Sequence, residues 1–312
     1  MPSTKAIKQR IKSVKNTSQI TKAMEVVSAT KMRRSQQFAL AARPYSVASL
    51  EMMQNLLRRT PVLPPILLER EIKNKALLII TSDKGLAGAF NANVLRKAEG
   101  WVAGELKKNT EFSVITVGKK SKDYFVRSPT SNRVVRSFFQ FGDYTDLSET
   151  LPIANLLLTG FQNGQWDSVD AVYTHFRTTL LQETVLKKIL PATEVGLEDA
   201  VASILPERGR YANLQPTTYN LQPRYNYEYK FEPSPTEILE TLVPQLIKMH
   251  IHHIILESNA SEHSARMVAM KNASDNAREL IGDLTLAFNK ARQANITREL
   301  VEITAGAEQI NQ

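Results

Sequence analysis

Residues 82–88 have the composition of a turn that binds phosphate. They read SDKGLAG, follow an apolar run at Ala76–Thr81 and precede a segment of helix-forming residues. A strand, a glycine-containing turn and a helix in this order can hold a phosphate at the helix N-terminus. The spacing differs from the phosphate-binding motifs, however, because Gly85 and Gly88 provide only G-x-x-G and Lys84 precedes the glycines instead of following them. A nucleotide site is therefore the less favoured interpretation of this loop.

The favoured interpretation is a structural turn. Asp83, Gly85 and Gly88 would shape it, with a positive φ at glycine, and Asp83 or Asn91 would cap a helix. A turn of this kind binds no ligand, so we expect no cofactor here.

A second candidate for chemistry is a group of histidines. His250 and His253 would share one face of a helix, with His252 beside them and Glu257 one turn further on. A metal site needs further convergent ligands, and none is evident, so a polar helix face is the favoured interpretation. His175 has no evident nucleophile partner, and no G-x-S-x-G motif occurs. The sequence therefore predicts neither a metal ligand nor a catalytic residue.

Composition and charge exclude some further kinds of site and argue against some kinds of partner. The chain has 312 residues and no cysteine, which excludes disulfides, thiolate zinc sites and cysteine nucleophiles. The net charge is +9, and nine basic residues against one acid give residues 1–34 a charge of +8. This segment lacks the aromatic residues of a single-strand nucleic-acid binder or an interfacial membrane helix, so we expect neither as its main role. The nine basic residues are Lys5, Lys8, Arg10, Lys12, Lys15, Lys22, Lys31, Arg33 and Arg34.

Both ends of the chain predict long helices. No glycine or proline interrupts the 41 residues between Pro2 and Pro44, and apolar residues recur there at spacings of three and four. We expect this helix to continue past Pro44 and to cover residues 1–60, and a second helix to cover residues 236–312, past Pro244. Each has one narrow apolar stripe and would be marginal alone, so the two are predicted to pair as an antiparallel coiled coil.

The middle of the chain alternates between strands and helices. This order predicts right-handed crossovers and a Rossmann-like α/β domain with a parallel sheet over residues 75–190. A linker at 61–74 precedes it, and an irregular connection at 191–235, rich in Pro, Asn, Gln and Tyr, follows it. Residues 179–190 are compatible with a strand or a helix. The expected strands are Ala76–Thr81, Phe112–Val117, Val134–Phe141 and Ser168–His175.

Two long stretches carry a family resemblance. NTSQITKAMEVVSATKMRRSQ (residues 16–36) and HSARMVAMKNASDNARELIGDLTLAFNKARQANITRELVEITAGA (residues 263–307) closely resemble the two ends of the gamma subunit of rotary F-type ATP synthases. The loop SDKGLAGAFN (residues 82–91) resembles that family's SDKGLCGGFN. The resemblance covers the whole chain in order and is weakest over residues 191–235.

The resemblance implies a non-catalytic rotor shaft. The terminal helices would enter a ring of three alpha and three beta subunits, and the α/β domain would lie beside the epsilon subunit on the ring of c subunits. Proton-driven rotation of the c ring would then be coupled to ATP synthesis in the alpha–beta ring. The chain would lie at the cytoplasmic face of a bacterial cell membrane, attached only through the c ring, and would bind no nucleic acid.

Particular residues match contact positions of the family. The resemblance implies that Met24, Arg292, Gln293 and Thr297 lie at or near the contact between shaft and ring, and that Lys31, Arg33 and Arg34 belong to a basic face opposite an acidic loop of the beta subunits. It implies a c-ring contact for Tyr229, Lys230 and Glu232.

The alternative function is a stand-alone Rossmann-like nucleotide-binding enzyme, with the terminal helices as coiled-coil dimerisation arms. Saturable micromolar binding of ATP, ADP or NAD would favour this enzyme. Co-purification with alpha, beta and epsilon subunits would favour the rotor.

Overall fold

Two helices dominate the secondary structure. The computed structural model describes residues 4–60, 63–141, 145–193, 196 and 231–310. Helix α1 (Thr4–Leu57) has 54 residues and helix α6 (Pro235–Ile310) has 76, and each continues through an internal proline, Pro44 and Pro244 respectively. The long terminal helices predicted from the sequence are thereby confirmed.

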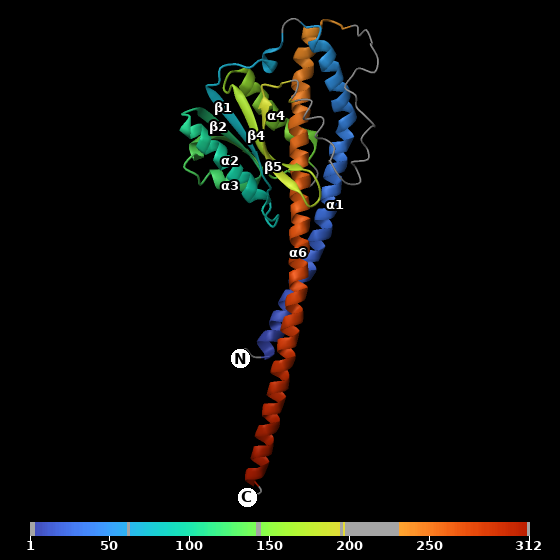
Figure 1. Ribbon diagram of the computed structural model, residues 1–312, viewed down its shortest axis with the longest axis vertical. Coiled ribbons are helices and arrows are strands. Elements are labelled where there is room, and N and C mark those ends of the chain that lie inside the picture. Colours follow the sequence, from blue (N-terminus) through green and yellow to red (C-terminus); the bar gives the residue numbers. More distant parts are fainter. Residues whose placement is uncertain (1–3, 61–62, 142–144, 194–195, 197–230, 311–312) are drawn as a thin grey trace. The chain divides into compact units, whose positions relative to one another are not determined.

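The chain divides into two compact units. The first contains Met1–Ser28 and Met267–Gln312, and the second contains Ala29–Arg266. Within the first unit, the N-terminal part of α1 lies antiparallel to the C-terminal part of α6 (Figure 1).

The buried seam of the first unit is narrow and partly polar. It combines a few apolar side chains with serine and threonine, and small residues of this kind let two helices approach closely. Its buried members are Ile7, Ser18, Thr21 and Ser28 on α1, and Met270, Ser274 and Ala277 on α6. Val27 is 52% exposed and Ser28 only 3%, so Ser28 and not its apolar neighbour lies in the seam.

The second unit contains a five-stranded sheet in the order β3-β2-β1-β4-β5 (Figure 1). Its strands are β1 (Asn74–Ile80), β2 (Glu111–Val117), β3 (Val134–Phe138), β4 (Ser168–Phe176) and β5 (Gln182–Leu190). Helices α2 (Phe90–Lys107), α3 (Lys119–Phe125) and α4 (Leu147–Gln162) connect them, and short 3-10 helices occur at Pro65–Leu67 and Ser131–Arg133. Strands β1 to β4 are parallel, which confirms the predicted Rossmann-like α/β class.

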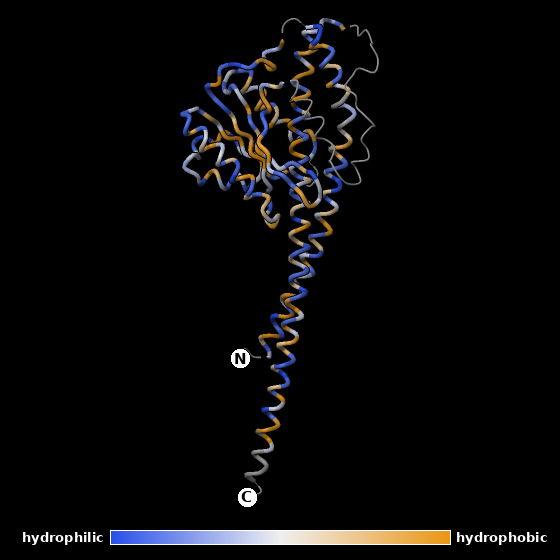
Figure 2. Tube along the Cα trace, viewed as in Figure 1, coloured by the Kyte–Doolittle hydropathy of each residue, from blue (hydrophilic) through white to orange (hydrophobic). Residues whose placement is uncertain are grey.

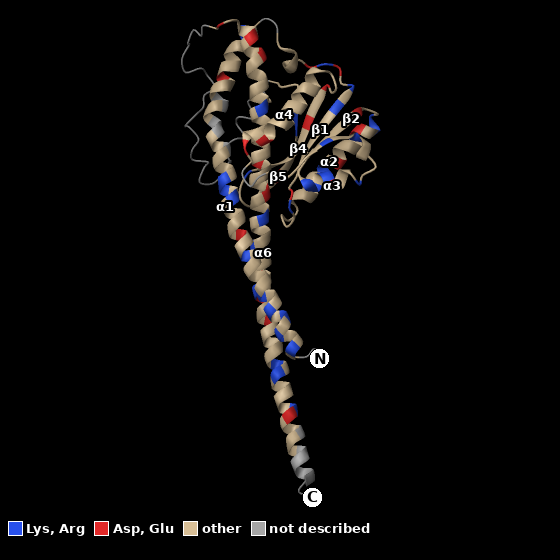
Figure 3. Ribbon diagram, turned by 180° about the vertical axis from the view of Figure 1, so that it is seen from behind, with Lys and Arg blue, Asp and Glu red and all other residues tan. Residues whose placement is uncertain are grey.

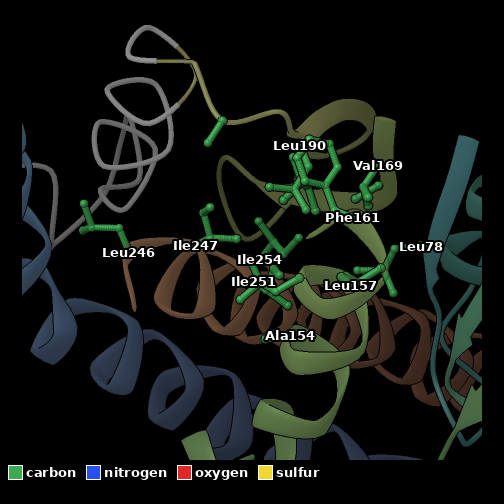
Figure 4. Close-up of a cluster of buried hydrophobic side chains, with 14 of the residues drawn as sticks. Leu78, Ala154, Leu157, Phe161, Val169, Leu190, Leu246, Ile247, Ile251 and Ile254 are labelled. Atoms are coloured by element: carbon green, nitrogen blue, oxygen red, sulfur yellow. The ribbon is translucent and has the colours of Figure 1, made fainter. Parts of the chain in front are cut away.

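The sheet of the second unit has a core on each face. Side chains of β1 alternate, so Leu77 and Ile79 face α2 and α3 while Leu78 and Ile80 belong to the opposite core. That opposite core also contains apolar residues of α4, α1 and the part of α6 before Met267. Figure 4 shows part of it, and Figure 2 shows the apolar centre of the sheet. This segment of α6 is therefore held against the sheet by apolar burial.

The structure decides one assignment that the sequence left open and corrects one strand boundary. Residues 179–190 form a turn and then β5, which pairs antiparallel with β4, so the sheet is mixed at this edge. The third strand ends at Phe138 and not at Phe141, and Gln140 has a positive φ of 65°. A left-handed residue interrupts an extended ladder, which explains the shorter strand.

Candidate functional site

The basic residues of α1 in the first unit are solvent-exposed. Lys5, Lys8, Arg10, Lys12 and Lys15 all lie on its exposed surface, and Figure 3 shows lysine and arginine along this part of α1. Further along, Lys22 Nζ lies 3.0 Å from Glu25 Oε2, an ion pair within one helix turn. The exposed positive charge suits an acidic protein partner.

The residues predicted to contact an alpha–beta ring lie at separate places. In the first unit, Met24 is half-buried close to the Ser28 end of its α1 segment, whereas Arg292, Gln293 and Thr297 are exposed on α6. Arg292 lies 25 residues beyond Met267, where α6 enters this unit, which corresponds to about 37 Å of helix. The predicted contact residues of this unit therefore lie in two separate regions and not in one cluster.

The other predicted contacts belong to the second unit or lie outside the described residues. Lys31 is half-buried, and Arg33 and Arg34 are exposed on α1 of the second unit. Of the predicted c-ring contacts, Glu232 is exposed just before α6, while Tyr229 and Lys230 lie outside the described residues.

The loop after β1 in the second unit is held by internal hydrogen bonds. The backbone N–H groups of Lys119 and Gln140 donate to the two carboxylate oxygens of Asp83, at 2.7 and 2.8 Å. Lys119 opens α3, so Asp83 caps the start of that helix. Asn91 caps no helix, because its side-chain oxygen accepts the Ser82 N–H at 3.0 Å. A carboxylate of the chain itself thus engages amides at the end of the sheet where a phosphate would bind in a dinucleotide fold.

Positive backbone φ angles mark the turns of this loop. Gly88 has φ 56°, as expected for a glycine turn, but the second left-handed residue is Leu86, at 63°, and not Gly85. Gly118, which joins β2 to α3, has φ 93°, and a Cβ on it would lie 2.2 Å from the carbonyl oxygen of Thr81. The loops after β1 and β2 therefore pack backbone against backbone.

An arginine of α6 that the sequence gave no reason to select also contacts this loop. Arg266 is only 7% exposed, and its guanidinium donates to the carbonyl oxygens of Lys84 and Gly85 at 3.2 to 3.3 Å. Glu262, one turn earlier, accepts from Arg266 Nη2 at 2.6 Å. Burial raises the pKa of Glu262, and the charge of Arg266 opposes that rise.

The comparisons with known proteins agree over the whole chain. A family model described as ATP synthase matches residues 3–310. The ATP synthase gamma chain of Roseiflexus castenholzii is 42% identical over 310 residues, which cover 98% of each chain. That of Chloroflexus aurantiacus is 40% identical over 311 residues, again covering 98% of each. This chain belongs to the ATP synthase gamma chain family.

Solved structures have the same fold as this gamma chain. A chain of the Euglena gracilis mitochondrial ATP synthase (OSCP, F1 and c-ring, rotational state 3) matches with a TM-score of 0.64 at 17% identity, covering 98% of the gamma chain and 94% of that chain. A chain of the Tetrahymena thermophila central stalk and c-ring matches with a TM-score of 0.57 at 23% identity, covering 82% and 99%. The likeness shows that this gamma chain has the fold of these ATP synthase chains.

Two histidines of α6 in this gamma chain are buried and a third, His250, is half-buried, which corrects the expectation of a polar helix face. His252 and His253 are 9% and 6% exposed, because this part of α6 packs against the sheet and α4. Burial, reinforced by Lys187, lowers the pKa of His250 to about 4. Burial and the neighbouring histidines lower the pKa of His253 to about 3. The His250 and His253 side chains are therefore neutral at pH 7.

Two contacts made by histidines were not predicted from the sequence. His175 on β4 pairs with Glu257 on α6, and Thr150 of α4 lies 2.9 Å from the Nδ1 atom of His252. Both pairs join residues far apart in sequence, so only the fold reveals them. Within the described residues, no group of three His, Asp or Glu side chains could hold a metal ion. The described helices also include none that is long and apolar enough to cross a bilayer.

Proposed function

We propose that this gamma chain is the rotor shaft that couples proton-driven rotation of a c-subunit ring to ATP synthesis in a ring of three alpha and three beta subunits. The bonds of ATP would form in those neighbours, and this chain would contribute no catalytic residue. The observation that carries the proposal is the match to gamma chains over 98% of the chain, with both long terminal helices included.

The surface of the first unit suits a shaft that meets three equivalent partners in turn. A large apolar patch would hold one orientation too strongly, whereas a solvated ion pair contributes only about 0–1 kcal/mol. On α1 of this unit, exposed apolar residues such as Ile20 and Val26 lie among exposed lysines. Weak, evenly distributed charged contacts would let the shaft pass each partner at low cost.

The partners follow from the family. In our proposal, Met24, Arg292, Gln293 and Thr297 contact the alpha–beta ring, and Lys31, Arg33 and Arg34 face acidic side chains of the beta subunits. Glu232 would lie near the c ring, with the epsilon subunit beside the sheet. The chain would be peripheral at the cytoplasmic face of a bacterial membrane and held there through the c ring.

The subunit composition of the native complex tests this proposal. Purification of the tagged chain from detergent-treated membranes should yield alpha, beta, epsilon and c subunits, with ATP hydrolysis that acidifies vesicles. Recovery of the chain only as a free monomer would contradict the proposal.

A matched pair of charge reversals tests the basic contact. Arg33→Glu should weaken binding to the alpha–beta ring at low salt. Arg96→Glu should not, because it changes an exposed arginine on α2, away from the basic segment. Equal binding by the two variants would exclude Arg33 from the contact.

A further inference from the structure

Side chains from one stretch of α6 donate hydrogen bonds to backbone carbonyl groups at the carboxyl end of the sheet, all within the second unit. The Ser261 hydroxyl donates to the carbonyl oxygen of Thr174, at the end of β4, at 3.1 Å. The Ser264 hydroxyl donates to the carbonyl oxygen of Thr179, in the turn between β4 and β5, at 2.6 Å. Arg266 then holds the loop after β1. Side chains of α6 thus donate hydrogen bonds to backbone carbonyl groups of β4, of the turn between β4 and β5, and of the loop after β1.

Arg266 makes the most extensive of these contacts. Its Nη2 atom reaches the carbonyl oxygens of both Lys84 and Gly85 and the carboxylate of Glu262, while its Nε atom also reaches Gly85. The Arg266 and Glu262 side chains are only 9% and 12% exposed. A guanidinium presents its donors in a fixed planar fork, and a lysine ammonium cannot reproduce that geometry. The contact is therefore specific for arginine.

The position of Arg266 along α6 makes it the last point at which α6 is attached to the α/β layer within the second unit. Arg266 is the last residue of α6 in the second unit, because the first unit resumes at Met267. Before this point, α6 is bound to the sheet by its apolar core and by the serine contacts. The guanidinium is thus the final polar attachment of the α/β layer to this helix within the unit.

We propose that Arg266 is a positioning residue that clamps the Lys84–Gly85 turn to α6, so that the α/β layer and the helix turn as one body. The proposal rests on the proposed function as a rotor shaft. It also gives the SDKGLAGAFN loop a role: its carbonyl oxygens accept the hydrogen bonds by which Arg266 attaches the loop to α6. Glu262 keeps the guanidinium oriented toward those carbonyl oxygens.

The test compares Arg266→Met with Arg96→Met in the reconstituted ATP synthase complex. Arg96 is an exposed arginine of α2 whose Nη1 atom lies 3.4 Å from the Asn93 side-chain oxygen, so its replacement controls for the loss of a positive charge. Two readouts are needed, namely amide hydrogen exchange of residues 82–91 and the number of protons pumped per ATP hydrolysed.

Loss of the clamp should make the loop amides of Arg266→Met exchange about tenfold faster, since a charge-assisted hydrogen bond is lost. Proton pumping should fall while ATP hydrolysis continues, and Arg96→Met should match the wild type in both. Arg266→Lys keeps the charge beside Glu262 and should give intermediate values, which also covers the case in which Arg266→Met fails to assemble.

Wild-type exchange and pumping in both Arg266 variants would overturn the clamp. Fewer assembled complexes with an unchanged pumping ratio would also overturn it, because that result indicates a purely structural role. If the wild-type chain itself supports no pumping, the rotor function fails instead, and the two failures remain distinguishable.

Discussion

Replacement of Gly118 by alanine should destabilise the second unit through two separate effects. Gly118 has φ 93°, a conformation that a residue with a Cβ adopts only under strain. A Cβ there would also lie 2.2 Å from the carbonyl oxygen and 2.7 Å from the carbonyl carbon of Thr81. Those atoms are backbone at the end of β1, so no side-chain rotation can relieve the collision.

The size of each effect follows from the geometry. At φ 93° and ψ 146°, Gly118 lies in a backbone region open essentially only to glycine, where a residue with a Cβ pays about 1–3 kcal/mol of strain. Forcing an extra methyl group into a packed site adds about 1–3 kcal/mol. We therefore expect Gly118→Ala to lower the free energy of unfolding by about 2–6 kcal/mol, as the sum of those two contributions.

Gly164→Ala is the matched control for this prediction. Gly164 also has a positive φ, 71°, but an added Cβ would meet no atom within 4 Å. This variant should therefore lose only the strain contribution of about 1–2 kcal/mol. Urea unfolding of the purified full-length chain, followed by circular dichroism, measures both variants. If Gly118→Ala were no less stable than Gly164→Ala, the backbone collision would be refuted.

Three further results are expected. Met24→Lys should reduce proton pumping more than assembly, because it places a charge at the proposed ring contact; parallel loss of ATP hydrolysis and pumping contradicts this. Truncation after Ala305 should impair the complex less than Arg292→Ala, as measured by ATP synthesis; equal losses would exclude a special role for Arg292. Folding should weaken as the pH falls from about 6.5 towards 4, because His250 and His253 keep a lowered pKa only when folded; equal urea midpoints at pH 7 and pH 5 would disprove it.

The terminal helices were predictable because local signals agree with the tertiary structure. A long interval without glycine or proline and a stripe with helical spacing both indicate a paired helix. The position of α6 against the sheet was not predictable from that stripe. Between Leu239 and Ile255 the helix buries residues on several sides, including His252 and His253, because the sheet and α4 cover it. The spacing of the histidines alone indicates a polar face, and tertiary packing overrides that signal.

The loop after β1, residues 82–91, was also only partly predictable from the sequence. The spacing of Gly85 and Gly88 departs from the known phosphate-binding motifs, and Gly88 has the positive φ that a structural turn needs. A left-handed leucine at position 86 is rare and gives no sequence signal. The contact with Arg266 joins residues about 180 positions apart, and no local pattern encodes a pairing of that kind.

Rotation of this chain is the most direct test of the central claim. A bead attached to the α/β layer, in a complex of this chain with alpha and beta subunits fixed to a surface, reports rotation under the microscope. The chain has no cysteine, so a single introduced cysteine gives a unique attachment point. The rotor function predicts continuous rotation in one direction when ATP is added. A stationary bead in a complex that hydrolyses ATP, together with saturable nucleotide binding by the isolated chain, would contradict it.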